Sequence, residues 1–215
     1  MTASRTAPRT QPDTLSRWRP GPARLGILLV GLWLFGTGEA LLVDSDLGVS
    51  PWTVLAQGVS EQTPLAVGTA TIAISFVVLL LWIPVRQKPG VGTFFNAVVI
   101  GIAIDATLAY LPGDWPLGVR LLEIPLGVAT VGLGSGIYLA QRLGPGPRDG
   151  LMTGLSRRTG HSLRLVRTLL EGTALVIGWM LGGTVGIGTV AFALGIGPCV
   201  QFFLERMDRR PGQEL

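Results

Sequence analysis

Long apolar runs alternate with short stretches rich in Gly, Pro, Arg and Lys along most of the chain. A helix of about 20 apolar residues crosses the hydrocarbon core of a bilayer, and six runs approach that length. They cover residues 25–43, 65–85, 93–111, 121–140, 165–181 and 189–204. The pattern therefore predicts an all-α, polytopic membrane protein with six transmembrane helices. Residues 1–22 and 209–215 are expected to be cytoplasmic tails, the first of them disordered.

The positions of the basic residues predict the orientation of these spans. With the N-terminus in the cytoplasm, Arg120 alone among the 17 Lys and Arg residues falls on the outer side. Because cytoplasmic loops are enriched in Lys and Arg, the sequence predicts a multi-pass protein of the cytoplasmic membrane with both termini inside. The net charge of +4 comes from residues at the ends of apolar runs, so it does not indicate a nucleic-acid partner.

Composition excludes several classes of protein. Only 14% of the residues are charged, against about 25% in soluble domains, so a water-soluble enzyme is excluded. Cys199 and His161 are the single residues of their types, which leaves no disulfide and no zinc site. The sequence holds no nucleophile–base pair and no His-Glu-x-x-His helix. It therefore predicts a protein that is not an enzyme and holds no metal or cofactor.

An internal repeat relates the two halves of the chain at an offset of 96 residues, without a gap. Matched pairs include Gly36 and Gly132, Pro51 and Pro147, Ser60 and Ser156, and Gly101 and Gly197. Residues 23–112 and 113–208 then form two repeats of three spans each within a single membrane domain. An odd number of spans makes the second repeat enter the membrane from the opposite side, so the repeats are predicted to be inverted, as in many transporters.

Between the first two spans of each repeat, the chain breaks and starts a short helix. The residues at these two places are Gly48, Pro51, Trp52, Thr53, Gly144, Pro147, Arg148 and Asp149. Gly and Pro end the preceding helix, and each Pro then occupies the first helical turn, where its missing N–H costs nothing. The short helices either lie on the membrane surface or re-enter it and line a cavity.

The function of these short helices depends on which alternative holds. Inside the membrane, their positive N-terminal ends would face an anion or a carboxylate, and Arg148 would add to that field. In the other reading, Asp149 caps its helix and Arg148 is a cytoplasmic anchor.

These signatures resemble the YczE/YyaS/YitT family of bacterial membrane proteins. The resemblance rests on L-G-V-S-P-W-T-V-L-A-Q-G-V-S, on L-G-P-G-P-R-D-G-L-M-T-G-L-S-R-R-T-G, and on G-V-G-T and G-I-G-T before the last span of each repeat. It covers about residues 24–205 and implies six spans, but the family's activity is largely undefined. The first signature usually reads P-W-D, whereas this chain has Thr53; Asp149 keeps the acid of the second. No large soluble domain follows residue 204, which favours the YczE branch over the YitT branch.

Four polar residues within the apolar runs are candidates for a substrate or ion pathway: Glu39, Asn96, Asp105 and Glu171. A charge at the bilayer centre costs at least ~2.5 kcal/mol, so such residues are functional candidates by default. The three acids have no acidic counterparts at the repeat offset, which favours one shared pathway over a symmetric scaffold. Hydrogen bonding between helices is the alternative. Five other acids are expected at hydrated interfaces: Asp44, Asp46, Glu61, Asp114 and Glu123.

The leading hypothesis is a small secondary transporter or permease of unknown substrate, coupled to protons or another cation. One alternative is a channel-like pore formed where the two broken helices meet. Another is a non-transporting membrane component of a secretion or biosynthetic assembly. The expected partners are the bilayer and a small molecule or ion, and a homo-oligomer remains open.

Overall fold

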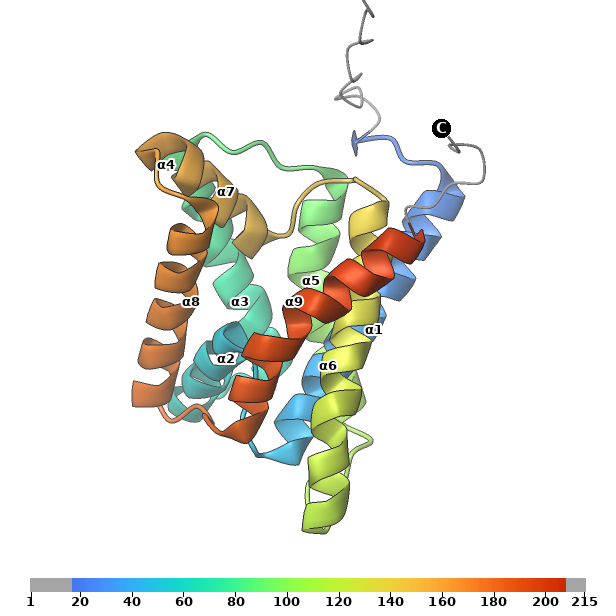
Figure 1. Ribbon diagram of the computed structural model, residues 1–215, viewed down its shortest axis with the longest axis vertical. Helices are drawn as coiled ribbons and strands as arrows, with labels where there is room; N and C mark the ends of the chain where they lie inside the picture. Colours follow the sequence, from blue (N-terminus) through green and yellow to red (C-terminus); the bar gives the residue numbers. More distant parts are fainter. Residues whose placement is uncertain (1–16, 208–215) are drawn as a thin grey trace, which may run out of the picture.

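The computed structural model describes residues 17–207, and all regular structure in that range is helical (Figure 1). The helices are α1 (Pro22–Ser45), α2 (Pro51–Gln62), α3 (Val67–Leu80), α4 (Trp82–Val85), α5 (Val91–Leu108), α6 (Leu117–Ala140), α7 (Pro147–Thr159), α8 (Leu163–Met180) and α9 (Ile187–Met207). The all-α prediction is confirmed for these residues. The expected tails lie largely outside them: residues 1–16 and 208–215 are not described.

Within residues 17–207, five segments are long and apolar enough to cross a membrane. They are α1, Val67–Val85 (α3 with α4), α5, α6 and α9. The span expected at residues 165–181 is a helix, α8, but it does not qualify, because Arg164, Arg167 and Glu171 lie within its 18 residues. The structure therefore supports a polytopic membrane protein with five clear spanning candidates, one fewer than the sequence pattern predicts.

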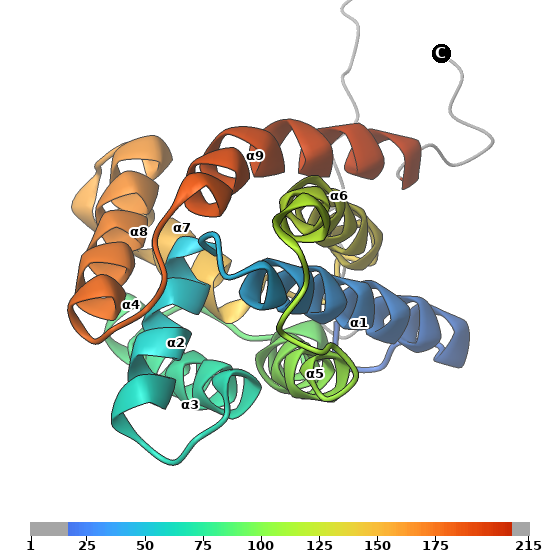
Figure 2. The same cartoon turned by 90° about the horizontal axis from the view of Figure 1, so that it is seen from below.

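Helices α1 and α6 form the centre of the bundle through close backbone contact. A Cβ atom at Gly38 would lie 2.7 Å from the carbonyl oxygen of Gly127, and one at Gly127 would lie 2.8 Å from that of Gly38. Small residues allow helices to approach this closely. Helix α5 packs on α1, and α9 packs on α6, so that α1 lies between α5 and α6 (Figure 2).

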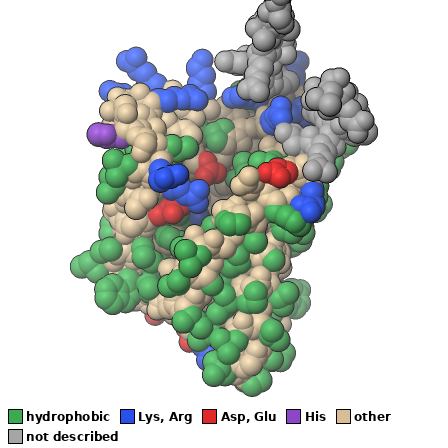
Figure 3. Space-filling view, in the orientation of Figure 1, with side chains coloured by type: hydrophobic (Ala, Val, Ile, Leu, Met, Phe, Trp, Pro, Cys, Tyr) green, Lys and Arg blue, Asp and Glu red, His purple; other side chains and the backbone are tan. Residues whose placement is uncertain are grey.

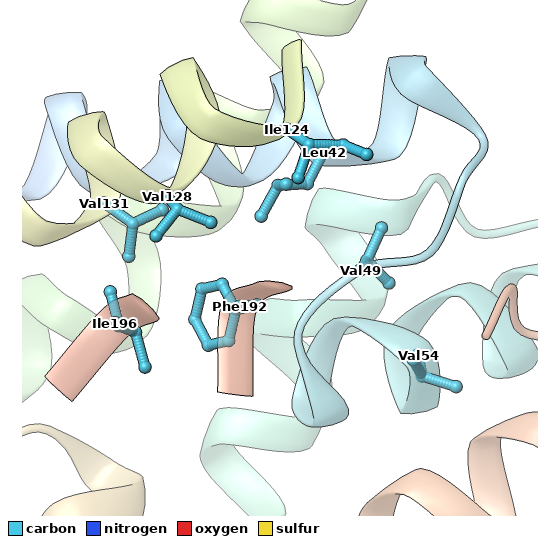
Figure 4. Close-up of a cluster of buried hydrophobic side chains, with 8 residues drawn as sticks. All are labelled: Leu42, Val49, Val54, Ile124, Val128, Val131, Phe192 and Ile196. Atoms are coloured by element: carbon cyan, nitrogen blue, oxygen red, sulfur yellow. The ribbon is translucent and has the colours of Figure 1, made fainter. Parts of the chain in front are cut away.

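Buried apolar side chains join these helices to the segment between α1 and α2 and to α2 itself. One cluster consists of Leu42, Val49, Val54, Ile124, Val128, Val131, Phe192 and Ile196 (Figure 4). Its members come from α1, α2, α6, α9 and the segment before α2. Because the cluster includes residues from both ends of the chain, it holds α2 and its connection against the central helices.

The chain breaks after α1 and after α6 pack against the opposite half of the chain. The carbonyl oxygen of Leu47 accepts a hydrogen bond from Gly188 N at 2.9 Å, and that of Leu143 accepts one from Gly92 N at 3.0 Å. The next residues, Gly48 and Gly144, have φ angles of 108° and 126°, which side chains other than glycine rarely adopt. These glycines fix the direction in which each short helix starts.

The ends of α1 and α6 meet through charged residues that the sequence analysis placed at hydrated interfaces. The Arg120 guanidinium lies 3.1 Å from the Asp46 carboxylate and donates to the carbonyl oxygen of Ser45 at 2.6 Å. Asp44 and Glu123 are only 8% and 5% exposed, so the side chains of these two acids are buried and do not make the expected hydrated contact. The packing of α6 on α1 buries them.

The flanks of the two halves differ in how tightly they close. Helix α3 packs along α5, and a Cβ atom at Gly68 or Gly101 would clash with the backbone of the other helix. Helices α8 and α9, at the corresponding positions, make at most marginal contact over their described lengths, and they lie apart in Figures 1 and 2. One flank is therefore closed and the other is open.

Candidate functional site

A cavity of about 450 Å³ lies between the central helices and α8. The starts of both short helices line it: Ser50, Pro51 and Trp52 at α2, and Gly146, Arg148 and Asp149 at α7. The two helices themselves lie toward opposite ends of the bundle (Figure 1). The structure thus brings together two segments that are almost 100 residues apart in sequence. We call this space the central cavity.

Glu39 of α1 is the most buried acid in the cavity wall, with 1% of its surface exposed. Its Oε2 atom accepts hydrogen bonds from Ser50 Oγ at 3.0 Å and Thr53 Oγ1 at 2.8 Å. Both donors belong to the start of α2, where the helix dipole also favours a negative charge. Its other oxygen, Oε1, is buried and has no partner within the described chain. Burial of an unpartnered carboxylate oxygen is costly, so Oε1 is an acceptor in need of a donor.

Arg148 of α7 lies over the ring of Trp52 of α2, with its guanidinium carbon 5.3 Å from the ring centroid. This distance is within the range of a cation–π interaction, which links the starts of the two short helices directly. Burial lowers the pKa of Arg148, while the negative charges of Glu39 and Asp149 act in the opposite direction. Arginine stays protonated in proteins, so the cavity wall carries a fixed positive charge.

Asp149 is open to the cavity and accepts a hydrogen bond from the Tyr138 hydroxyl at 3.2 Å. Its side chain makes no capping bond to the start of α7, in contrast to the capping alternative from the sequence. Burial among the helices raises the pKa of the Asp149 carboxyl, and the bond from Tyr138 and the charges of Arg167 and Arg148 offset part of that rise. The Asp149 carboxylate therefore lines the cavity and also binds the Tyr138 hydroxyl of α6.

The side of the cavity next to α8 carries an ion pair. Arg167 Nε lies 2.9 Å from Glu171 Oε1, and the two side chains are 53% and 30% exposed. Apolar residues of α9 form the facing wall: Phe192, Ile196, Val200 and Leu204. Acidic and basic side chains are visible from outside between α8 and α9 (Figure 3). We call this gap the α8–α9 opening.

The structure separates the four pathway candidates. Glu39, Asn96 and Glu171 line the central cavity, whereas Asp105 is absent from its lining. Asp105 instead accepts hydrogen bonds from Gly68 N at 2.6 Å and from Thr69 N at 2.9 Å, which ties the start of α3 to α5. Its position matches the alternative role of holding helices together.

The other signature residues position the short helices. Gly48 and Gly144 form the breaks described above, and the carbonyl oxygen of Pro147 accepts a hydrogen bond from Trp82 Nε1 at 2.9 Å. Tyr138 and Arg167, which also line the cavity, were not singled out from the sequence. Nothing in the local pattern marks Tyr138, since it sits in an apolar run. The sequence places Arg167 only among the basic residues of the cytoplasmic side.

No group of three or more His, Cys, Asp or Glu side chains in residues 17–207 is arranged to hold a metal ion.

Comparison with known proteins establishes the family. The chain is 34% identical over 176 residues to the uncharacterized membrane protein YczE of Bacillus subtilis, covering 81% of this chain and 82% of that protein. It is 30% identical over 184 residues to the uncharacterized protein YyaS of Bacillus subtilis, covering 84% and 92%. The chain belongs to the YczE/YyaS family.

Two further matches agree with this assignment. The chain is 41% identical over 207 residues to an uncharacterized protein of Haemophilus influenzae, covering 96% of this chain and 95% of that protein. Residues 22–205 match a family of unknown function (DUF6198). No solved structure matches the chain significantly. The chain is thus a membrane protein of a YczE/YyaS-type family, and the names of these three relatives state no activity.

The two halves of the chain place an acid and a hydroxyl at exchanged positions around the cavity. Thr53 and Asp149 occupy corresponding positions in the two short helices, and Glu39 and Ser135 occupy corresponding positions in α1 and α6. All but Thr53 line the cavity, and Thr53 donates to Glu39. The first half therefore has its acid on the long helix and its hydroxyl on the short one, and the second half has the reverse. Each short helix start keeps one carboxylate nearby.

Proposed function

We propose that the protein is a small secondary transporter that carries a small molecule through the central cavity. The single observation that carries this proposal is the meeting of the two short helix starts in one cavity, with Trp52 beneath Arg148. Secondary transporters commonly bind their substrates where the ends of discontinuous helices meet near the membrane midplane. In this proposal α2 and α7 re-enter the membrane from opposite sides, and α8 completes a six-span bundle.

Paired contacts support the inverted-repeat part of the proposal. The bond from Gly188 N to Leu47 O and the bond from Gly92 N to Leu143 O are equivalent under the repeat. Leu47 corresponds to Leu143, and Gly92 to Gly188, at the offset of 96 residues. Basic side chains gather at the end of the molecule that carries α4 and α7 (Figure 3). By the enrichment of Lys and Arg in cytoplasmic loops, this end is cytoplasmic and both termini are inside.

The two flanks differ in how far the cavity is closed off from lipid. Gly68 and Gly101 bring α3 and α5 into backbone contact on one flank, while the other flank is open. A carrier exposes its site to one face of the membrane at a time and an open pore to both, so access from each face separates the two. Glu39, with its unpartnered Oε1, is the group proposed to take up the coupled proton or cation.

Cysteine accessibility tests this proposal in a background with Cys199→Ser. Ser75 and Ser135 are buried and line the cavity, so Ser75→Cys and Ser135→Cys are small changes that report on access to it. Each variant is exposed to a membrane-impermeant thiol reagent in right-side-out and in inside-out vesicles, with and without a proton gradient. His161→Cys, in the exposed segment between α7 and α8, is the control for sidedness.

The carrier proposal expects each cavity cysteine to react from one side at a time, with the preferred side changed by the gradient. Simultaneous reaction from both sides would indicate a pore. Reaction that stays on one side under every gradient would contradict transport and favour the role of a component in a larger assembly.

A further inference from the structure

The α8–α9 opening connects the central cavity sideways to the surface that faces lipid in the proposed function. Its α9 wall is apolar except for Gln201, and the outer surfaces of α8 and α9 expose Leu169, Val176, Val190 and Leu194. A lateral opening with such surroundings admits an apolar chain from the bilayer without exposing that chain to water. A fully water-soluble molecule has no need of such a route.

The residues themselves keep this opening from closing. On the closed flank, Gly68 allows α3 to touch α5; the corresponding residue on α8 is Arg164, which is exposed. The counterpart of Asp105 is Gln201, which donates to Glu205 of its own helix at 2.9 Å. A Cβ atom at Gly197 would meet nothing within 4 Å, whereas its counterpart Gly101 is in backbone contact. The opening between α8 and α9 therefore follows from the side chains that replace the close-packed residues of the other flank.

The polar part of the cavity offers two unused groups of opposite charge. Glu39 Oε1 is a buried acceptor without a partner. The Arg148 guanidinium stacks on Trp52 but has no hydrogen bond or ion pair with any described residue. The two charges are not paired with each other within 4 Å, although both line the cavity. A ligand that carries one cationic and one anionic group satisfies both at once, and charge-assisted hydrogen bonds of this kind are among the strongest in proteins.

We propose that the substrate of the central cavity is a zwitterionic amphiphile whose head lies between Arg148 and Glu39 and whose apolar tail passes through the α8–α9 opening into the bilayer. The anionic group of the head binds Arg148, and its ammonium group donates to Glu39 Oε1. The proposal deepens the transporter function proposed above and rests on it for the role of the cavity as a substrate site.

Binding of a matched set of compounds tests the head and the tail separately. The full-length protein is purified in a neutral maltoside detergent, and bound molecules are counted by native mass spectrometry. The probe is 1-oleoyl-lysophosphatidylethanolamine. Oleoyl lysophosphatidic acid lacks the ammonium group, oleylamine lacks the anion, and phosphoethanolamine lacks the tail. We expect the complete probe to bind roughly 10-fold or more tightly than each of the three, the difference expected for one charge-assisted hydrogen bond or a buried chain.

Variants locate the binding in the cavity. Glu39→Gln and Arg148→Gln each remove one charge and are expected to weaken the complete probe by roughly 10-fold, and Arg148→Met, which keeps an apolar stem against Trp52, is used if Arg148→Gln does not fold. Gly197→Trp places a large side chain in the α8–α9 opening and is expected to abolish binding. Gly26→Trp is the matched control, because Gly26 is also exposed with nothing within 4 Å of its Cβ position; it should bind as the unmodified protein does.

Three outcomes would overturn this substrate class. They are undiminished binding to Glu39→Gln and Arg148→Gln, undiminished binding to Gly197→Trp, and binding of phosphoethanolamine as tight as that of the complete probe. The last would indicate a soluble zwitterion. If the probe fails to bind while the cavity cysteines still change their accessible side with the gradient, the transporter stands and only this substrate class fails.

Discussion

The two flanks of the cavity follow the same plan but end in different states. Helix α3 closes against α5, whereas α8 stands apart from α9. Each pair has a glycine at the matched place, Gly101 on α5 and Gly197 on α9, yet only Gly101 is in contact with another helix. The difference teaches that a small residue permits close packing but does not cause it. The partner helix must also offer a small residue and a bond that holds its end.

Those two requirements are met on one flank only. Gly68 lets α3 approach α5, and Asp105 accepts the free N–H groups at the start of α3. Such groups at a helix start otherwise lack partners. On the other flank Arg164 replaces Gly68, and closing α8 onto α9 would remove its charge from water, which is costly without a partner. The halves differ in a second way, since the acid lies on α1 in the first half and on α7 in the second.

The largest predicted effect comes from placing an acid on the short helix of the first half, as in the second half. Thr53→Asp would place a second carboxylate where Thr53 now donates to Glu39 at 2.8 Å, in a position with no exposed surface. We expect the free energy of unfolding to fall by about 3 kcal/mol, the scale of an uncompensated buried charge. The loss is expected to shrink at acid pH, where the two carboxyls can share a proton. Unfolding by SDS in mixed micelles, followed by tryptophan fluorescence, measures it.

The double variant Glu39→Ser with Thr53→Asp is the control for this prediction. It copies into the first half the arrangement of Ser135 and Asp149, so most of the lost stability should return. If the losses in free energy of unfolding were strictly additive in the double variant, the two positions would not interact. That result would contradict the idea that the acid on one helix depends on the hydroxyl on the other.

Much of this comparison can be predicted from the sequence. The matched glycines, the two breaks with Pro51 and Pro147, and the unpaired Glu39 all follow from local patterns and from the repeat. Local patterns succeed here because helix breaks and apolar runs depend on neighbouring residues. The family assignment, which rests on the same signatures, is confirmed by the relatives.

The rest depends on contacts between distant residues. No local pattern shows that Arg148 lies on Trp52, that Tyr138 binds Asp149, or that Asp105 holds α3 and not a substrate. The burial of Asp44 and Glu123 likewise follows from how α6 packs on α1. The charged residues of α8 are visible in the sequence, but counting apolar runs gives them little weight. For this reason the sequence predicts six spans, whereas five of the described segments qualify.

A smaller effect separates the two matched glycines. Gly101→Ala would force α3 and α5 apart, because the new Cβ would clash with the backbone of Gly68. We expect a loss of about 1–3 kcal/mol, as for other overpacked interiors. Gly197→Ala is the matched change on the open flank and should leave stability equal or slightly higher, since Ala is the better helix former. Equal losses in both variants would mean that α8 and α9 are in contact in the membrane.

The bonds at the start of α3 give the next effect in size. Asp105→Ala removes the acceptor of Gly68 N and Thr69 N, and a lost helix cap typically costs about 1–2 kcal/mol. Gln201→Ala, the counterpart on α9, removes only an exposed bond to Glu205 and should change the free energy of unfolding by less than about 0.5 kcal/mol. The difference between the two variants measures how much the cap contributes to closing the first flank. A large loss in Gln201→Ala would contradict it.

The smallest effect is expected at the edge of the α8–α9 opening, with Glu171→Gln. The Arg167–Glu171 pair is partly exposed, and an i,i+4 pair in water contributes up to about 0.5 kcal/mol, with the basic residue first in the weaker order. The free energy of unfolding in mixed micelles should therefore fall by less than about 0.5 kcal/mol. A pair enclosed by hydrocarbon behaves differently, because loss of one partner leaves a buried charge and costs about 3–5 kcal/mol. A small loss thus means that water reaches the head end of the opening, as a charged ligand head requires, whereas a large loss means that lipid seals it at this level.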